Sequence, residues 1–163
     1  MGLIIKDKLQ AMMVGYPTVS DKYNVAGGIL SGSTPVQFGD LVKTTSTVGY
    51  YAPATSVTLA TLGGFVVSTN VKLADGFPGT LVQVNGGEAF NLLLDGYIAI
   101  ALDASADDDY ITPNADVYLI LATGKCTTSD QAAAGTIVAI PGYKFTGYYE
   151  LQGTTLVAEI CVK

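Results

Sequence analysis

Thr155-Leu-Val-Ala-Glu-Ile-Cys-Val162 is the stretch that decides the fold class of this 163-residue chain. Two sets of side chains alternate along it: Leu156, Ala158, Ile160 and Val162 on one side, and Val157, Glu159 and Cys161 on the other. This period of two predicts a β-strand with one buried face and one mixed face. Similar runs of β-branched and aromatic residues lie between the 19 glycines and six prolines, a pattern typical of an all-β protein.

Turn signals divide the rest of the chain into strands. Asn85-Gly86-Gly87 favours the positive φ of a tight turn and predicts a hairpin between residues 79–84 and 88–94. Asp95-Gly96 interrupts a second apolar stretch and predicts either another hairpin turn or a bulge at a bend. Further strands are predicted over residues 36–44, 64–71, 116–121, 136–140 and 143–151, and short helical turns over 6–13, 104–109 and 129–134.

Eight or so strands at this spacing predict one all-β domain. We expect a single antiparallel β-barrel or jelly-roll-like domain over residues 16–163, preceded by a short N-terminal arm of residues 1–15.

The residues that the sequence lacks argue against catalysis. The chain has no His, no Trp and no Arg, and all eight basic residues are Lys. The commonest general base and metal ligand is therefore missing, as is the side chain that grips carboxylates and phosphates with two parallel hydrogen bonds. Gly124-Lys125 does not complete a phosphate-binding loop, because Leu119 and Cys126 stand where that motif needs Gly and a hydroxyl. We predict no enzyme activity and no cofactor.

One acidic cluster and two cysteines have simple structural interpretations. Asp107-Asp108-Asp109, near Asp103 and Asp116, offers oxygens to a weak Ca²⁺ site, but it lacks the spacing of a calcium-binding loop. A solvated acidic loop is the favoured interpretation, so no metal site is predicted, although the sequence leaves a bound cation open. Cys126 and Cys161 are expected to be small buried hydrophobes.

Charge limits the partners. The net charge is −6 and charged residues make up only 13% of the chain. A nucleic-acid partner is not expected, because few scattered cations release few counterions. No stretch reaches the roughly 18 apolar residues of a membrane span and no signal peptide is recognised, so a soluble protein made in the cytosol is expected. Exposed apolar surface is then predicted to contact another protein. The alternative is a surface rich in Ser, Thr and Gly.

Ten tyrosines give the interface prediction. The doublets Tyr50-Tyr51 and Tyr148-Tyr149 each place one ring on either side of a strand, so one ring faces outward. The alternative is that these rings cover the ends of the core. In the arm we expect an adjacent subunit to contact Leu3, Ile4, Ile5, Met12, Met13 and Tyr16. Edge strands that need covering predict a homo-oligomer, either a dimer or a trimer.

The chain resembles the structural cement (capsid decoration) proteins of tailed bacteriophages. The resemblance lies in residues 6–11, 15–19, 21–23, 36–42, 64–66, 69–74, 76–79, 87–92, 96–99 and 158–163, such as Gly15-Tyr-Pro-Thr-Val19, Val36-Gln-Phe-Gly-Asp-Leu-Val42 and Ala158-Glu-Ile-Cys-Val-Lys163. These segments are ordinary strand and turn sequences that span nearly the whole chain.

The resemblance implies a β-barrel or jelly-roll domain on the outer surface of a phage head. It would be made in the host bacterial cytoplasm, bind the major capsid protein, bridge neighbouring shell subunits and carry no catalytic residues. A head fibre is a further candidate partner. The alternative function is a non-catalytic β-sandwich binding module that holds carbohydrate or anchors a head fibre.

Overall fold

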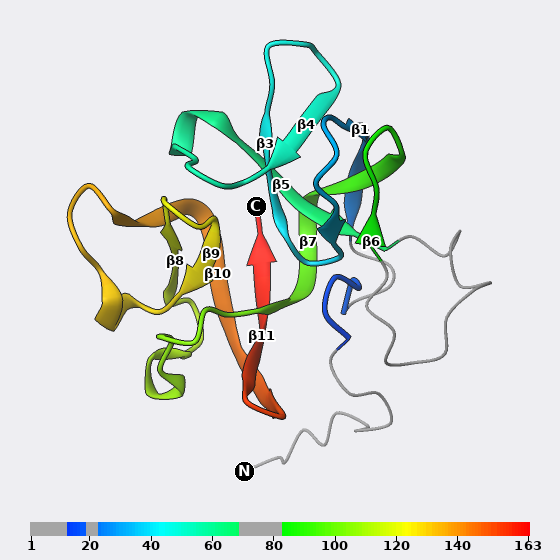
Figure 1. Cartoon of the computed structure of the whole chain (residues 1–163). Coiled ribbons are helices and arrows are strands. Elements are labelled where there is room, and N and C mark those ends of the chain that lie inside the picture. Colours follow the sequence, from blue (N-terminus) through cyan, green and yellow to red (C-terminus); the bar gives the residue numbers. More distant parts are fainter. Residues whose placement is uncertain (1–12, 19–22, 69–82) are drawn as a thin grey trace.

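The computed structural model describes residues 13–18, 23–68 and 83–163, and these residues form strands joined by turns (Figure 1). The strands are β1 (Asn24–Leu30), β2 (Val36–Gln37), β3 (Leu41–Thr44), β4 (Tyr50–Pro53), β5 (Leu62–Val67), β6 (Gln83–Val84), β7 (Ala89–Ala101), β8 (Asp116–Ile120), β9 (Lys125–Thr127), β10 (Ile137–Gln152) and β11 (Thr155–Val162). Short 3-10 turns are η1 (Leu59–Thr61), η3 (Asp108–Tyr110) and η4 (Ser129–Gln131). The all-β prediction is confirmed.

Nine strands form one large sheet in the order β1-β4-β3-β5-β7-β11-β10-β8-β9, and β2 pairs with β6 in a small second sheet. The large sheet is mixed, because β1 and β4 are parallel, with Ile29 opposite Tyr50. The prediction of a purely antiparallel sheet was therefore wrong. The cause is long-range: β1 and β4 are separated by β2 and β3, so no hairpin fixes their relative direction. In the described part of the chain no helix is long and apolar enough to cross a membrane.

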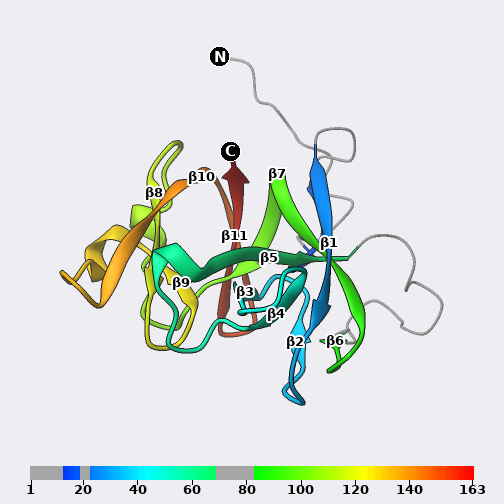
Figure 2. The ribbon, with the colours of Figure 1, turned by 90° about the horizontal axis from the view of Figure 1, so that it is seen from above.

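The strand pairings close on themselves at one side of the molecule. Strand β1 pairs with β4 at one edge and with the first half of β7 at the other. The pairings β4–β3, β3–β5 and β5–β7 complete the circuit. Figure 2 shows these strands on one side, with β8, β9 and β10 on the other and β11 between them.

Strands β3, β5 and β7 form a wall that is buried on both faces. Phe65 and Val67 belong to the main core, whereas Val66 between them belongs to a second, smaller core. Leu93 and Leu92 divide in the same way along β7. We call the residues of this arrangement the shared wall: Leu41, Val42, Phe65, Val66, Val67, Leu92 and Leu93. Successive side chains of a strand face opposite ways, so an unbroken apolar run fits a strand covered on both sides.

Strand β7 continues through Asp95-Gly96 instead of turning back. Its first half pairs with β1 and β5, and its second half pairs with β11 from Gly96 to Ala101. The register slips by one residue at Leu94, where Asn24 faces Asp95 but Val25 faces Leu93. Gly96 has a φ of +130°, which only glycine adopts readily. Of the two predicted alternatives, the structure shows the bulge at a bend.

The hairpin predicted at Asn85-Gly86 forms its turn but not its strand pair. The backbone N–H of Glu88 donates to the Asn85 carbonyl at 3.0 Å, and the Asn85 N–H donates to the Glu88 carboxylate at 2.8 Å. Val84 nevertheless pairs with Val36 of β2, and β7 pairs with β1, β5 and β11. Among the described residues the predicted pairing is therefore wrong. Turn chemistry is local, whereas the partner of a strand is decided by packing.

Two strands that the sequence predicted as separate are a single strand in the structure. Residues 136–140 and 143–151 lie in the continuous β10, which pairs with β8 and then with β11. The predicted strand over residues 36–44 is instead broken into β2 and β3. The expected strands over 116–121 and 155–162 are confirmed as β8 and β11. The helical turns expected near residues 104–109 and 129–134 are the 3-10 turns η3 and η4.

A wide bulge in β10 accommodates a buried carboxylate. Phe145 faces Ile160 and Tyr149 faces Ala158, so three residues of β10 lie opposite Glu159 alone. The Thr146 hydroxyl donates to the Glu159 carboxylate at 2.9 Å, and Glu159 is only 3% exposed. Gly147 has a φ of +90°, and a Cβ there would lie 2.8 Å from Pro113. The bulge thus supplies a polar partner inside the sheet, which a buried polar group requires.

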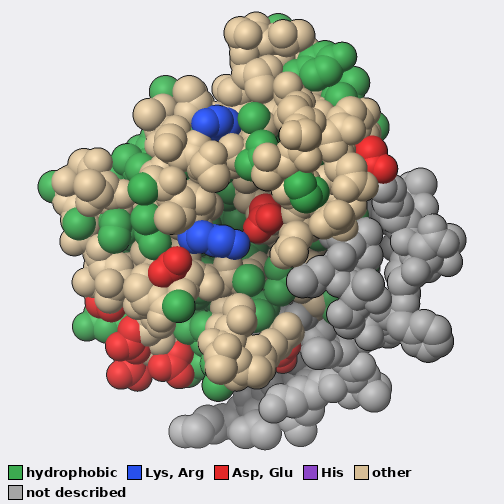
Figure 3. Space-filling model, viewed as in Figure 1, with side chains coloured by type: hydrophobic (Ala, Val, Ile, Leu, Met, Phe, Trp, Pro, Cys, Tyr) green, Lys and Arg blue, Asp and Glu red, His purple; other side chains and the backbone are tan. Residues whose placement is uncertain are grey.

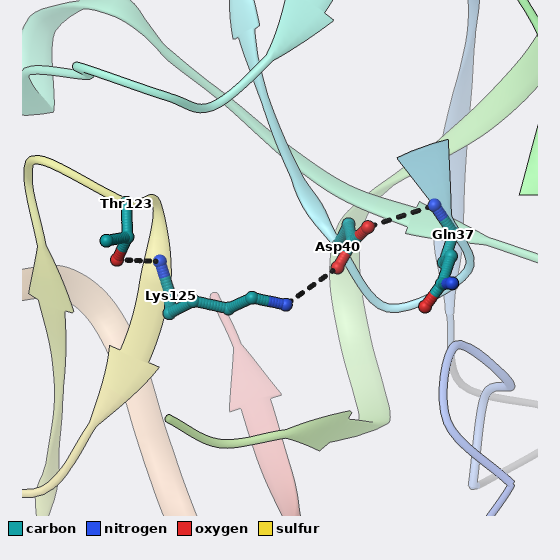
Figure 4. A network of polar contacts seen from close by, with 4 residues as sticks. All are labelled: Gln37, Asp40, Thr123 and Lys125. Atoms are coloured by element: carbon teal, nitrogen blue, oxygen red, sulfur yellow. Dashed lines mark hydrogen bonds and ion pairs between the residues drawn. The ribbon is translucent and has the colours of Figure 1, made fainter. Parts of the chain in front are cut away.

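The turn between β8 and β9 fastens the two sides of the molecule together. The N–H groups of Ser56 and Val57 donate to the carbonyls of Ala122 and Leu121. Lys125 reaches Asp40 with 3.5 Å between Nζ and Oδ1, and Asp40 accepts the Gln37 N–H at 2.9 Å (Figure 4). Because this ion pair is partly exposed, we expect it to orient the turn more than to stabilise it.

Both cysteines are free thiols. Cys126 is buried in the main core, where burial raises the pKa of its thiol to about 12. Cys161 is half-buried. The prediction of small buried hydrophobes is therefore confirmed for Cys126 and holds in part for Cys161.

Candidate interaction surfaces

An acidic loop follows β7 and is shaped by its own aspartates. The Asp103 carboxylate accepts the Ser105 N–H at 3.0 Å and the Ser105 hydroxyl at 2.8 Å. Asp107 accepts the Asp109 N–H at 3.0 Å and so caps η3. Short acidic side chains favour such local bonds, which is why this segment turns instead of continuing the strand.

The loop is tied to the segment after β9. The Asp107 N–H donates to the Thr128 hydroxyl oxygen at 2.9 Å, and that hydroxyl donates to Asp130 at 2.5 Å. The hydrogen bond from Thr128 is the main reason why the pKa of Asp130 lies below its ordinary value. Asp130 is therefore ionised at neutral pH, and it adds a negative charge beside the loop.

Between this loop and the end of the β10–β11 hairpin lies a hollow of about 650 Å³, which we call the acidic hollow. It is lined by Leu102, Asp103, Ala104, Ser105, Ala106, Asp107, Asp108, Asp130, Gln131, Tyr149, Leu151, Thr154, Thr155 and Leu156. Acidic side chains gather at the lower left of the space-filling view, where η3 lies (Figure 3). No described lysine is among the lining residues.

The rim of the hollow is apolar as well as acidic. Tyr149 and Leu151 are 44% and 69% exposed, and both line the hollow from β10. The pKa of the Tyr149 phenol is raised, chiefly because the Asp108 carboxylate repels a phenolate. Asp108 also accepts the phenol's hydrogen bond, which favours the neutral ring.

The carboxylates of Asp107, Asp108 and Asp109 lie within 4.8 Å of one another, but all three residues are exposed. Asp107 is already engaged in capping η3, and Asp108 accepts from Tyr149. This geometry is that of a solvated acidic loop, and we assign no metal to it.

The turn between β3 and β4 forms a second, uncharged surface. Residues 44–50, Thr-Thr-Ser-Thr-Val-Gly-Tyr, are called the β3–β4 tip. The Thr45 hydroxyl lies 3.0 Å from the Tyr50 carbonyl and 3.1 Å from the Thr47 carbonyl, which closes the turn. Val48 is 98% exposed at its end. The tip lies at the top of Figure 1, and the β10–β11 hairpin lies at the bottom.

Comparison with known proteins places the chain in a family. The sequence profile described as "Structural cement protein (E217 gp24/Pam3 gp6)" matches residues 5–161. The chain belongs to this family. A chain with a similar fold is found in a solved structure, "The capsid of Myoviridae Phage XM1". That chain has a TM-score of 0.63 and 14% identity, over 97% of this chain and 95% of the other. No curated protein matches the chain significantly.

The tyrosines of the two doublets, which the sequence analysis of this cement-family chain treated alike, differ in their exposure. Tyr50 is 40% exposed at the β3–β4 tip, whereas Tyr51 packs edge-on against Phe90 with ring centroids 5.8 Å apart. Tyr148 and Tyr149 are both exposed on β10. Tyr51 therefore follows the alternative interpretation, a ring that covers the core, while the other three keep accessible surface.

Of the residues predicted to form the arm's interface, only Met13 and Tyr16 are among the residues that the structure describes. Met13 is exposed, and Tyr16 packs edge-on against Phe38 with ring centroids 6.4 Å apart. The Gly15 N–H donates to the Ala99 carbonyl at 2.8 Å, which holds this segment beside β7. Leu3, Ile4, Ile5 and Met12 lie outside the described residues, so the boundary between arm and domain and the arm's role in the interface stay predictions.

The sequence missed Leu151, Leu102 directly after β7, and the β11 residues Thr155 and Leu156, which also line the hollow. The signal for Leu151 was present, because Leu151 and Tyr149 are two positions apart on one strand and share a face. Their position beside Asp103 and Asp130 could not be predicted, because it depends on how three distant segments pack.

Proposed function

We propose that this chain is a decoration protein that binds the outer surface of a phage head and bridges neighbouring major capsid subunits. Membership of the structural cement family over residues 5–161 carries the proposal. The capsid origin of the solved relative with the same fold supports it. The chain would then reside on the virion and perform no catalysis.

The two exposed surfaces suit a bridging role. A protein that joins two shell subunits needs two separate contacts, and linking weak contacts raises the effective concentration of the second to the millimolar range. The β3–β4 tip and the hairpin at the acidic hollow lie at opposite ends of the view in Figure 1. The closed circuit β1–β4–β3–β5–β7 supports the further proposal that a small barrel holds these surfaces rigidly apart.

The β3–β4 tip is our candidate for the contact with the shell. It carries no charge, so docking it removes no ion from water. Val48 and Tyr50 supply apolar surface, and Tyr keeps a hydrogen-bonding hydroxyl.

Co-sedimentation with capsids that lack this protein tests the proposal. We expect saturable binding at a fixed stoichiometry and a higher capsid melting temperature. Val48→Asp is expected to weaken binding roughly tenfold or more, because it buries an unpaired charge in the contact. Asp95→Asn serves as a control, since this exposed residue on β7 is remote from the tip in sequence.

Absence of saturable binding by the unaltered protein would contradict the decoration role. Equal binding by Val48→Asp and by the unaltered protein would instead reject the β3–β4 tip and leave the decoration role standing.

A further inference from the structure

The second half of strand β10 has one open edge. Residues 149–152 pair with residues 155–158 of β11 across the turn Gly153-Thr154. On the other side of β10, the pairing with β8 reaches Lys144, and the hydrogen bonds to the segment before β8 reach Phe145. Beyond Phe145, no strand in the described part of the chain lies along this side of β10. In Figure 1 the end of this hairpin lies below the other labelled strands.

The backbone groups of Tyr149 and Leu151 point toward the open edge. The Leu102 N–H donates to the Leu156 carbonyl at 2.9 Å, so the backbone of Leu156 is turned away from β10. Leu156 lies opposite Leu151, and the two therefore form a pair without mutual hydrogen bonds, in which the N–H and C=O of Leu151 point away from β11. Tyr149 is two positions away on the same strand and has the same orientation. Two donors and two acceptors are thus available to an added strand.

The side chains of the same two residues line the acidic hollow. Tyr149 is 44% exposed and Leu151 is 69% exposed, so apolar surface lies beside the open backbone groups. Many proteins block such an edge with Lys, Pro or a covering segment. Residues 148–152 read Tyr-Tyr-Glu-Leu-Gln and contain neither Lys nor Pro. An exposed edge of this kind suits the docking of an extended segment from another chain.

The charge of the hollow selects the occupant. Four aspartates line it, Asp103, Asp107, Asp108 and Asp130, and no described lysine does. A second copy of this chain, paired edge to edge, would bring the same four carboxylates to the contact, and like charges repel. A basic segment would meet opposite charge instead. Charge complementarity therefore favours a basic segment of a different protein over a second copy.

The spacing of the basic residues follows from the strand. In an added strand, the residues opposite Tyr149 and Leu151 are two positions apart, and their side chains share the face that lines the hollow. The Tyr149 phenol donates to the Asp108 carboxylate, so a long side chain at this place reaches the aspartates. A lysine or arginine beside Tyr149 would place its ammonium or guanidinium group there and its methylene groups against the apolar rim.

We propose that the open edge of β10 and the acidic hollow together bind an extended segment of a partner protein that carries Lys or Arg at alternate positions. The segment adds a strand to β10 through the backbone of Tyr149 and Leu151, and the aspartates select its basic side chains. This inference goes beyond the capsid contact proposed at the β3–β4 tip and does not depend on it.

Fluorescence anisotropy of labelled peptides with the full chain tests the proposal. The probe is capped Val-Lys-Val-Lys-Val, and its matched control is Val-Glu-Val-Glu-Val. We expect saturable binding of the lysine peptide with a dissociation constant below about 1 mM. The glutamate peptide should bind at least about tenfold more weakly, because its carboxylates meet those of the hollow.

Methylation of the peptide backbone tests the added strand. One version of the probe is N-methylated at both lysines and another at the first and third valines. In antiparallel docking the lysine N–H groups face Tyr149 and Leu151, so lysine methylation should weaken binding roughly tenfold or more and valine methylation should leave it unchanged. The reverse result would support parallel docking at the same edge, and equal binding of the two versions would overturn the proposal.

Two variants of equal net charge test the hollow. Asp107→Asn with Asp108→Asn removes two charges and keeps a side chain that can cap η3, and we expect roughly tenfold weaker binding of the lysine peptide. Asp40→Asn with Asp95→Asn removes two charges outside the hollow and should leave binding unchanged. Thermal melting of both variants separates loss of binding from loss of folding.

Three further results would overturn the proposal. They are failure of the unaltered protein to bind the lysine peptide, equal weakening by the two charge variants, and dissociation of an oligomer of the unaltered protein when the peptide is added. Sedimentation velocity with and without the peptide detects the last result, which would assign the open edge to a second copy.

Discussion

The shared wall and the acidic hollow contain similar apolar side chains, but these side chains are buried in the wall and exposed at the hollow. Leu93 in the wall is 1% exposed and belongs to the main core, whereas Leu151 at the hollow is 69% exposed. The wall has apolar residues on successive positions and no charge, while the hollow has them on alternate positions beside aspartates. The difference teaches that an apolar strand residue stabilises this fold only where a second layer covers its face.

The largest expected loss of stability comes from a substitution in the shared wall. Phe65→Ala should lower the free energy of unfolding by about 3–5 kcal/mol, because it removes a buried ring and its edge-on contact with Tyr143. Tyr110→Ala removes a ring of similar size that is 44% exposed, and it should cost less than about 1 kcal/mol. Urea unfolding followed by circular dichroism measures both, and equal losses would refute the distinction.

The same residue type at the two places gives a matched comparison. Leu93→Ala should cost about 2–5 kcal/mol, because it leaves a cavity in the main core beside Phe65 of β5. Leu151→Ala should change stability by less than about 0.5 kcal/mol, because water already reaches this side chain. Denaturation midpoints at equal m-values test the pair. A loss above about 1 kcal/mol at Leu151 would mean that the hollow is part of the core.

The bulge of β10 lies between the two regions and should have an intermediate effect. Thr146→Val keeps the shape of the side chain but removes the hydroxyl that donates to the buried Glu159, so we expect a cost of about 1–3 kcal/mol. Thr154→Val makes the same change at an exposed position and should be nearly neutral. If the two variants unfolded at the same urea concentration, the hydroxyl at Thr146 would have no role in the bulge.

The smallest expected effect comes from removing one negative charge at the acidic hollow, and it is seen in the pKa of Tyr149. Asp108→Asn should move the pKa of Tyr149 back down toward its ordinary value, because it removes the main cause of the rise. A raised pKa means that the folded state holds the proton more tightly. The resulting stabilisation is present below the unfolded pKa near 10 and is lost as the pH rises through the folded pKa.

Asp108→Asn should therefore reduce the alkaline loss of stability. Nuclear magnetic resonance titration of ring-labelled tyrosine measures the change. Asp109→Asn is the matched control, since Asp109 has a weaker effect on Tyr149. An equal shift in both variants would show that net charge, not the contact with Asp108, raises the pKa.

Local sequence signals were reliable for turns and for strand faces. Asn85-Gly86 forms its turn, and Thr155–Val162 is a strand whose Ala158, Ile160 and Val162 enter the main core as the alternation predicted. The same signals could not assign partners. Val84 pairs with Val36, which lies more than forty residues earlier in the chain. Tertiary packing brings β6 beside β2, and no local sequence pattern links the two strands.

The candidate surfaces were predicted only in part. Tyr50 and Tyr149 are exposed as expected, but Tyr51 turns inward because β4 lies beside β1 and places its ring over Phe90. The acidic loop was expected from Asp107-Asp108-Asp109, yet its position opposite Leu151 depends on the length of the β10–β11 hairpin and on the bulge within it.

The sequence by itself determined the all-β class, the lack of His and Arg chemistry, the excess of negative charge and the family of this chain. Those properties depend on residue type and on periods of two along single strands. Only the tertiary structure decided that β1 runs parallel to β4, that one wall serves two cores, and that the aspartates and Leu151 enclose one hollow. These arrangements depend on contacts between segments far apart in the chain, whose free energies no single segment carries.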